Sequence, residues 1–291
     1  MLEGIIIKGL GGFYYVKTSE GIIESRARGV FREDDVTPLI GDRVKIKISE
    51  EDGTGYIVEI NERKTQLLRP PVANVTQAIV VMSVKNPNIN TWLLDKFLLM
   101  VEYEGLDIVI CINKYDLDKD LCEGFKVIYE KAGYKVLLTS CKLDIGIDSL
   151  KKYLYGNISV FAGPSGVGKS SLLNMVDDRL NLETASISNK TKRGKHTTRH
   201  IELLEIDDTS YILDTPGFSS LNLDFIKDGS FVKRNFREIN KYGKECRFLT
   251  CLHDKEPNCA VKEKVEEGII DEGRYNNYLL LLNEVRNMRR Y

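Results

Sequence analysis

The sequence lacks the features that mark a secreted or membrane-bound protein. It begins with Met1-Leu2-Glu3-Gly4 and turns polar by Lys8, so it has neither a basic opening nor the long apolar run of a signal peptide. Its longest apolar stretches, such as residues 279–282, are too short to cross a bilayer. We therefore expect a cytoplasmic protein with no membrane partner, in which the six cysteines stay reduced and serve as core, metal-binding or catalytic residues.

An excess of either charge is also absent. Lys and Arg number 42 against 43 Asp and Glu, so the formal net charge of -1 does not by itself indicate a nucleic-acid partner. Basic residues do cluster locally, at Lys190, Lys192, Arg193, Lys195 and Arg199 and at Arg286, Arg289 and Arg290. Such clusters fit an RNA contact or a plain solvated surface, and both readings stay open. No internal repeat is present, and 291 residues have room for two or three domains.

The first part of the chain is rich in short strand patterns. Five such stretches, separated by turn residues such as Gly11-Gly12 and Asp52-Gly53, cover residues 4–8, 13–18, 21–26, 42–48 and 56–60. Because so few residues cannot cover the face of an open sheet, we expect the strands to close on themselves. Residues 1–68 are therefore predicted to form a small β-barrel of the OB type, an RNA-binding fold.

After residue 69 the pattern changes to apolar runs that alternate with amphipathic stretches. The strand-like runs cover residues 78–84, 107–112, 136–139, 158–162, 201–206 and 211–213. Apolar residues at helical spacing predict helices over 92–104 and 125–132. This alternation is typical of a parallel α/β sheet, which we expect over residues 69–225, followed by a helical domain over residues 226–291.

A glycine-rich loop follows one of these strands. It matches the P-loop pattern and lies between the strand at 158–162 and a predicted helix at 171–176. Backbone N–H groups and the helix N-terminus would surround phosphate oxygens there, with Lys169 at the terminal phosphates and Ser170 on Mg²⁺. The predicted nucleotide contacts from this loop are Gly163, Pro164, Ser165, Gly166, Val167, Gly168, Lys169, Ser170 and Ser171.

A second motif identifies the base. Asn113-Lys114-Tyr115-Asp116 ends a strand, and an Asp carboxylate there can accept hydrogen bonds from both N1–H and the exocyclic amine of guanine. Adenine would leave that carboxylate unpaired, which discriminates by roughly 10⁴-fold or more. The expected ligand is therefore GTP rather than ATP. The predicted base contacts from this motif are Asn113, Lys114 and Asp116. Thr139-Ser140-Cys141 ends the next strand and is predicted to support the guanine through Ser140, although by itself it is an ordinary strand-end turn.

The remaining nucleotide contacts are predicted around the γ-phosphate. Asp214 ends a strand and would hold Mg²⁺ through water, and Gly217 would donate its N–H to the γ-phosphate. A threonine in the preceding loop would close over the phosphate and ligate Mg²⁺, and Thr197 and Thr198 are both eligible, with Thr198 our choice.

The group that positions the attacking water is not the usual glutamine. Phe218 stands where Ras-like enzymes carry it, and a phenyl ring cannot orient water. Hydrolysis is therefore slow alone, or another group takes this role. His196 is the candidate catalytic residue, because an imidazole can hydrogen-bond the water near neutral pH. The alternative is that His196 merely contacts RNA or solvent on a basic loop.

The order of the motifs is permuted. The guanine motif precedes the P-loop, whereas ordinary small GTPases run P-loop first. A circular permutation costs little structurally, because domain termini usually lie close together on the surface. As a consequence, the segment after Gly217 runs directly into the C-terminal domain.

That domain carries a compact metal-binding pattern. Cys246, Cys251, His253 and Cys259 have the spacing C-x4-C-x-H-x5-C in a polar segment. Three thiolates and one imidazole complete a closed tetrahedral set, which suits structural Zn²⁺ and leaves no position open for catalysis. Cys111, inside an apolar strand, is expected to be a core residue.

Together these residues resemble a known family, the circularly permuted GTPases that depend on the small ribosomal subunit (RsgA, or YjeQ). The resemblance covers nearly the whole chain and rests on the permuted motifs, on Lys195-His196-Thr197-Thr198, on Asp214-Thr-Pro-Gly217-Phe218 and on the Cys3His pattern. It implies a cytoplasmic, rRNA-binding GTPase in late maturation of the small subunit. Hydrolysis to GDP would be stimulated by the subunit and coupled to release, with Mg²⁺ and structural zinc, and we expect a monomer.

Two other classes remain as alternatives. One is a GTP-dependent RNA-binding scaffold, in which nucleotide occupancy matters and turnover does not. The other is a P-loop nucleotide kinase, against which the guanine motif argues. Phosphate release stimulated by small subunits separates the GTPase from the scaffold, and equal binding of ATP and GTP would favour the kinase.

Overall fold

The computed structural model describes residues 1–27, 31, 36–68, 70–182, 201–214, 223, 226 and 228–288. The chain divides into two compact units, each assembled from segments far apart in the sequence. The first comprises Met1–Gln77, Lys151–Phe161 and Ser186–Gly217, and the second comprises Ala78–Leu150, Ala162–Ala185 and Phe218–Tyr291.

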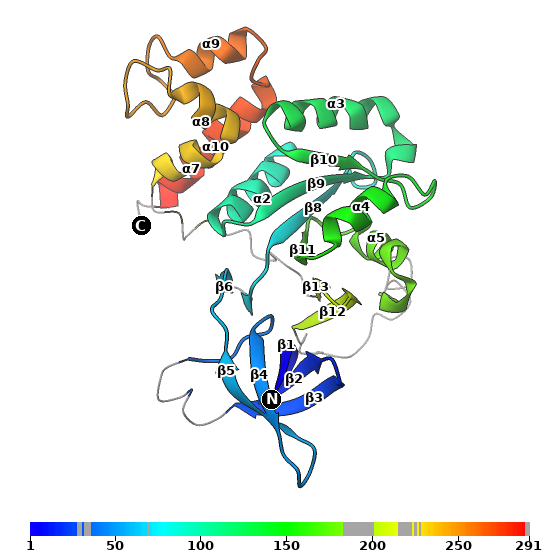
Figure 1. Ribbon diagram of the computed structural model, residues 1–291. Helices are drawn as coiled ribbons and strands as arrows, with labels where there is room; N and C mark the ends of the chain where they lie inside the picture. The colour runs from blue at the N-terminus through cyan, green and yellow to red at the C-terminus, as the bar shows by residue number, and fades with distance from the viewer. Residues whose placement is uncertain are drawn as a thin grey trace. The chain divides into compact units, whose positions relative to one another are not determined.

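The first unit contains the expected barrel. Its strands are β1 (Leu2–Leu10), β2 (Phe13–Thr18), β3 (Gly21–Ala27), β4 (Arg43–Ile48) and β5 (Gly55–Ile60). They pair in the order β1-β2-β3-β5-β4, and β4 pairs back onto β1, so the sheet closes (Figure 1). Because side chains alternate across each strand, one face of the strands fills the interior. Ile6, Val16, Val44, Ile46 and Ile57 form that core and are at most 1% exposed.

The other strands of this unit form a mixed sheet rather than the all-parallel one expected. β11 (Ile158–Ala162) runs parallel to β13 (Ser210–Asp214), but β12 (Glu202–Asp207) pairs antiparallel with β13. The turn between β12 and β13, where Asp207 accepts from the N–H of Thr209, is too short for the crossover that parallel strands need. Two further short strands, β6 (Gln66–Leu68) and β7 (Pro71–Ala73), pair antiparallel at the point where the sequence pattern changes, after residue 69.

The second unit contains buried strands covered by helices. β8 (Gln77–Ser83), β9 (Asp107–Asn113) and β10 (Lys135–Leu138) lie side by side in the order β10-β9-β8, with β9 and β10 parallel. Up to residue 182, the described α-helices are α2 (Thr91–Tyr103), α3 (Lys119–Lys131), α4 (Ile147–Leu154) and α5 (Lys169–Val176). α3 begins at Lys119, earlier than predicted, because the Asp118 side chain caps it by accepting from the N–H of Leu121.

In residues 228–288, the structure describes four helices, α7 (Gly229–Asn235), α8 (Arg237–Gly243), α9 (Ala260–Glu266) and α10 (Glu272–Met288). Figure 1 shows them gathered beside α2 and α3. Their shared core includes Leu99 and Met100 of α2 together with Phe236, Tyr278 and Leu281. The helical C-terminal part is therefore packed into the same compact unit as α2 and α3.

A buried ionic network joins these helices. Arg274 of α10, 3% exposed, donates to Glu238 of α8 at 2.7 and 2.9 Å and pairs with Asp95 of α2. Tyr129 of α3 and Asn277 of α10 also donate to Asp95, at 3.0 and 2.7 Å. Burial raises the pKa of Asp95, and the guanidinium opposes that shift. Losing one partner of such a network is costly, because the other charge would stay buried and unpaired.

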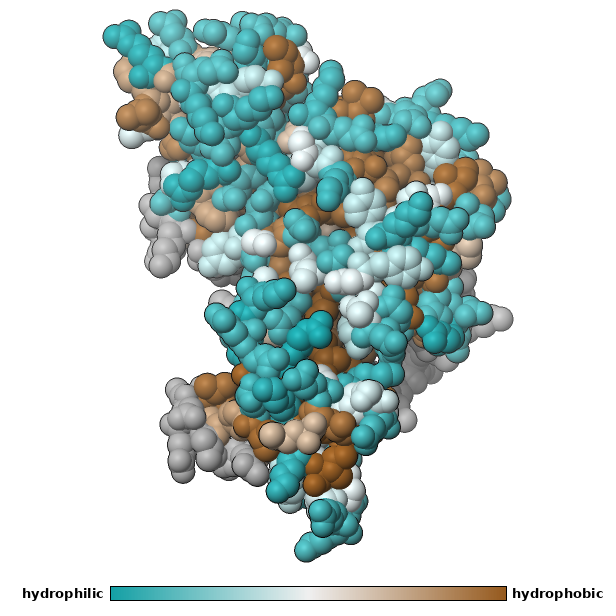
Figure 2. Space-filling view, viewed as in Figure 1, coloured by the Kyte–Doolittle hydropathy of each residue, from teal (hydrophilic) through white to brown (hydrophobic). Residues whose placement is uncertain are grey.

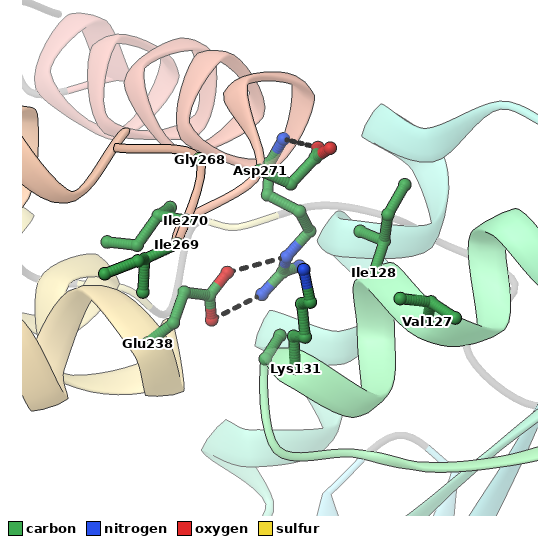
Figure 3. Close-up of a pocket in the computed structure, with 10 residues that line it drawn as sticks. Val127, Ile128, Lys131, Glu238, Gly268, Ile269, Ile270 and Asp271 are labelled. Carbon is green, nitrogen blue, oxygen red and sulfur yellow. Dashed lines mark hydrogen bonds and ion pairs between the residues drawn. The ribbon is translucent and has the colours of Figure 1, made fainter. Parts of the chain in front are cut away.

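A cavity of about 70 Å³ lies against this network. Figure 3 shows Glu238 on one side, with Ile269 and Ile270 of the α9–α10 connection, and Ile128 and Lys131 of α3 on the other. Each of the three guanidinium nitrogens of Arg274 already donates to Glu238 or Asp95. The cavity is thus lined by apolar side chains together with charged ones, and its arginine is already paired.

Candidate nucleotide and metal sites

The glycine-rich loop, residues 163–168, connects β11 to α5 and has a backbone that only glycine can adopt at its ends. Gly163 has a φ of +135° and Gly168 a φ of +100°. A Cβ atom on Gly163 would lie 2.1 Å from the carbonyl oxygen of Val81, and one on Gly168 would lie 2.4 Å from Nδ2 of Asn113. The loop thus packs directly on the C-terminal parts of β8 and β9, so its backbone lies where these strands end.

Lys169 begins α5 and folds back over this loop. Its Nζ donates to the carbonyl oxygens of Gly163 and Pro164, at 2.7 and 2.8 Å. Partial burial lowers the pKa of the ammonium group. Ser170 and Ser171 follow in the first turn of α5 and are half-buried. The ammonium and the helix N-terminus therefore meet at one point, which is the arrangement that binds phosphate groups.

The guanine motif lies at the end of β9. Lys114 takes a left-handed conformation, with φ of +62°, and a short 3-10 helix, η1 (Tyr115–Leu117), carries Asp116. The buried hydroxyl of Ser140 donates to Oδ1 of Asp116 at 2.6 Å, while Ser140 itself exchanges backbone hydrogen bonds with Ile145. The carboxylate is thus held in a fixed orientation at a partly exposed position. This is what two-point recognition of a base edge requires.

Asn113 connects the guanine motif to the phosphate loop. Its Nδ2 donates to the carbonyl oxygen of Val167 at 2.9 Å, and its Oδ1 accepts from Thr139 Oγ1 at 3.1 Å. The thiol of Cys111 lies 3.2 Å from the same hydroxyl. Lys114 strengthens the link, since its Nζ donates to the carbonyl oxygens of Gly166, at 2.7 Å, and Asn86. The two motifs predicted separately therefore form one hydrogen-bonded assembly.

The contacts of Thr139 lead to a testable prediction. Thr139→Val has nearly the same shape but removes the donor to Asn113, so that a buried amide oxygen loses its partner. We expect GTP affinity to fall about 5- to 30-fold, measured by titration with a fluorescent GTP analogue. Thr139→Ser, which keeps the hydroxyl, is the matched control and should stay close to wild type. Equal affinity of the Val and Ser variants would show that Asn113 does not need this bond.

Most of the contacts predicted around the γ-phosphate involve residues that the structure does not describe. Asp214 is the last residue of β13, at the carboxyl end of that strand as expected. His196, Thr197, Thr198, Gly217 and Phe218 lie outside the described residues, so their roles stay predictions. Sequence reasoning missed the carbonyl oxygens of Asn86 and Val167, because a backbone acceptor leaves no signal in residue type.

The four residues of the Cys3His pattern come together. Their ligand atoms all lie within 4.8 Å of one another. Sγ of Cys259 lies 3.8 and 3.9 Å from the sulfurs of Cys246 and Cys251. Nδ1 of His253 lies 3.3 to 3.5 Å from all three sulfurs. A tetrahedral Zn²⁺ site has about 3.8 Å between sulfurs and about 3.5 Å between nitrogen and sulfur, so the donor set fits such an ion.

The surrounding residues hold this cluster in place. Tyr275 and Tyr278 of α10 donate to the carbonyl oxygens of His253 and Leu252, each at 2.6 Å. Burial raises the pKa of Cys251 to about 12 and lowers the pKa of His253 to about 4. Both shifts have the same main cause, since burial penalises the charged forms. Buried thiols grouped around a neutral imidazole are what a bound cation would stabilise as thiolates.

A phosphate loop tied to a guanine-binding motif, with the guanine motif first in the chain, defines a P-loop GTP-binding protein of permuted order. The chain belongs to the RsgA GTPase family. The family described as RsgA GTPase matches residues 60–224, and its RsgA N-terminal domain matches residues 3–57. The chain is therefore a GTP hydrolase, and its family implies Mg²⁺ with GTP.

Relatives match over the whole length. The small ribosomal subunit biogenesis GTPase RsgA of Clostridium perfringens (strain 13 / Type A) is 52% identical over 289 residues, covering 99% of each chain. The protein of that name from Caldanaerobacter subterraneus subsp. tengcongensis is 49% identical over 293 residues, covering 100% of this chain and 98% of the relative.

Solved structures agree with the fold. The crystal structure of YloQ, described as a circularly permuted GTPase, has a TM-score of 0.81 at 39% identity and covers 99% of this chain and 96% of that one. YjeQ from Thermotoga maritima has a TM-score of 0.83 at 38% identity, covering 98% of both. The predicted combination of an OB-type barrel, a permuted GTPase fold and a C-terminal Cys/His cluster is confirmed. Among the described residues, no helix is both long and apolar enough to cross a membrane.

Proposed function

We propose that this chain hydrolyses GTP to GDP and phosphate during late maturation of the small ribosomal subunit. The subunit would stimulate hydrolysis, and hydrolysis would release the protein. The observation that carries the nucleotide part is the hydrogen-bonded assembly of Asn113, Thr139 and the phosphate loop. The names of the full-length relatives support the small subunit as partner.

Within this proposal the described residues bind and orient GTP. Backbone N–H groups of residues 163–171, all except Pro164, receive the phosphates, and Lys169 exchanges its contacts with the carbonyl oxygens of Gly163 and Pro164 for phosphate oxygens. Asp116, held by Ser140, accepts from the guanine edge. Ser170, Thr198 and Asp214 would hold Mg²⁺, which neutralises charge on the transferred phosphoryl group.

The remaining assignments complete the proposal. Thr197 and Gly217 would contact the γ-phosphate, and His196 would position the attacking water. Zn²⁺ would fill the Cys3His cluster as a purely structural ion, because four protein ligands leave no open position. We further propose a cytoplasmic monomer that binds rRNA, with domain boundaries at residues 1–68, 69–225 and 226–291.

The proposal is tested by phosphate release with purified small ribosomal subunits, with large subunits as the control. Turnover should rise only with small subunits. Tight GTP binding without stimulated release would instead support the scaffold, and equal binding of ATP and GTP would support a kinase. Single-turnover hydrolysis by a His196→Ala variant with small subunits tests the water-positioning role, and an unchanged rate would remove His196 from it.

Binding to small subunits should also depend on nucleotide. Sedimentation with GTP, GDP and a non-hydrolysable analogue compares the three states. We expect the analogue to retain the protein on the subunit and GDP to release it. Equal sedimentation in all three states would contradict nucleotide-controlled release.

A further inference from the structure

An exposed apolar pair lies on the loop between two of the metal-cluster cysteines. This tip loop, residues 247–250, joins Cys246 to Cys251. Leu249 is 96% exposed and Phe248 is 45% exposed. In Figure 2, brown atoms project at the left edge of the C-terminal part, among teal ones. Full burial of a leucine side chain is worth about 1.5 to 3 kcal/mol, so the almost complete exposure of Leu249 beside the half-exposed Phe248 calls for an explanation.

The tip loop is held in this exposed position from several sides. Both of its ends are cluster residues, Cys246 and Cys251. The N–H of Cys251 donates to the carbonyl oxygen of Phe248 at 3.1 Å, and Lys233 Nζ of α7 donates to that of Leu249 at 3.3 Å. The loop cannot fold back to bury its apolar residues without breaking these contacts. Its side chains are therefore presented in advance, which reduces the entropy cost of binding a partner.

The charge around the tip loop is positive. The Arg247 guanidinium lies 5.6 Å from the centre of the Phe248 ring, Lys244 is exposed, and Lys233 reaches the loop backbone. Of the nearby carboxylates, Asp254 pairs with Arg286 at 2.9 Å, and Glu256 accepts from two backbone N–H groups. Glu245, next to Cys246, is exposed. This one carboxylate is outnumbered by the three cations Arg247, Lys244 and Lys233.

We propose that the tip loop binds unpaired RNA bases. This rests on the proposed function, since the RNA would belong to the small subunit. Phe248 and Leu249 would pack on the face of a base, while Arg247 and Lys244 contact the adjoining phosphates. Unpaired bases in RNA are recognised by stacking on aromatic rings and guanidinium planes. Phenylalanine and arginine are enriched at protein–protein interfaces as well, but lysine is depleted there, so Lys244 and Lys233 beside the loop favour RNA over a protein partner.

Two substitutions of one residue separate stacking from general apolar contact. Phe248→Tyr keeps the aromatic ring, whereas Phe248→Leu keeps only the apolar character. We expect Phe248→Leu to weaken binding to deproteinised small-subunit RNA about 5- to 100-fold and Phe248→Tyr to stay near wild type. Leu280→Gln, an exposed leucine on α10, is the control for loss of an apolar surface residue and should have no effect.

Salt dependence provides a second readout. Arg247→Gln should reduce the slope of log affinity against log salt by about 0.7 to 1, because one phosphate contact is lost. Unstimulated GTP hydrolysis, measured without RNA, should be the same in all four variants, which checks that they are folded. Filter binding to the RNA at several salt concentrations measures both the affinity and its dependence on salt.

The outcomes distinguish a failure of the tip-loop proposal from a failure of the proposed function. If Phe248→Leu weakens binding to whole small subunits but not to the free RNA, the partner is a ribosomal protein and the RNA assignment is overturned. If Phe248→Leu and Phe248→Tyr bind both probes like wild type, the tip loop is not an interaction surface. If the wild-type protein itself fails to bind small subunits, the proposed function fails instead.

Discussion

An Asp116→Asn variant is expected to lose GTP affinity by about 10²- to 10⁴-fold, because one of the two acceptors that face the two donors of guanine becomes a donor. Oδ1 of Asp116 already accepts from Ser140 at 2.6 Å, so the carboxylate cannot turn to compensate. In the variant, the amide oxygen can still accept from N1–H, but the amide N–H₂ group meets the exocyclic amine. This clash lies at the centre of base recognition, and the loss is correspondingly large.

The same substitution should favour xanthine nucleotides. Xanthine keeps N1–H and replaces the exocyclic amine with a carbonyl oxygen, which the new amide can donate to. Xanthosine triphosphate should therefore bind the Asp116→Asn variant more tightly than GTP does, reversing the wild-type order. Isothermal titration of both nucleotides against both proteins measures this reversal.

The control for this variant is Asp120→Asn. Asp120 lies in the first turn of α3, is exposed, and has the same chemistry close by in the chain. Its substitution should leave the preference for GTP unchanged. If Asp116→Asn retained GTP and rejected xanthosine triphosphate, the base would have to be read by another residue, and the assignment of the motif at 113–116 would be wrong.

The sequence was sufficient for features that depend on local pattern. The five barrel strands, the buried runs that became β8 and β9, and the Cys3His spacing were all predicted from periodicity or residue type and are present. The antiparallel pairing of β12 was not predicted, because an apolar run of that length does not reveal the direction of its neighbour.

Contacts across the fold could not be predicted from local pattern. Arg274 and Asp95 are separated by 179 residues, and neither stands in a motif. Thr139 appeared only as an ordinary strand-end residue, yet its hydroxyl orients Asn113. In both cases the partner is chosen by tertiary packing, which brings polar groups into a buried space where each must be satisfied.

The metal cluster gives the largest expected effect on stability. Structural Zn²⁺ sites contribute about 10 kcal/mol or more of binding free energy, which is available only to the folded state. Cys251→Ser, or removal of the ion with a chelator, should therefore unfold the segment around α8 and α9. Because Glu238 of α8 binds Arg274, which also pairs with Asp95, the loss should extend to the contact between α2 and α10.

Hydrogen exchange measures this spread directly. Protection should fall in α7–α10 and at the end of α2, while the barrel strands keep theirs. Cys141→Ser is the matched control, since Cys141 is a half-buried cysteine outside the cluster. It should retain both the ion and the melting temperature of the wild-type protein.

Metal retention should also depend on pH with a defined sign. In the metal-free cluster, burial raises the pKa of Cys251 to about 12 and also raises that of Cys259, so protons compete strongly with the metal for these sulfurs. Affinity should therefore fall as pH falls, by up to about tenfold per pH unit for each of these two sulfurs that takes up a proton.

His253 should not set this dependence near neutral pH. Its pKa is lowered to about 4, so the imidazole is neutral and able to bind metal well below pH 6. The sign follows from that shift: the folded state favours neutral His253, and this contribution to stability is lost as pH falls below the unfolded value of about 6.5. A release curve with a slope near one would assign the transition to a single proton rather than to the thiolates.

If Cys251→Ser kept one metal ion per chain and an unchanged melting temperature, the ion would have to be bound elsewhere.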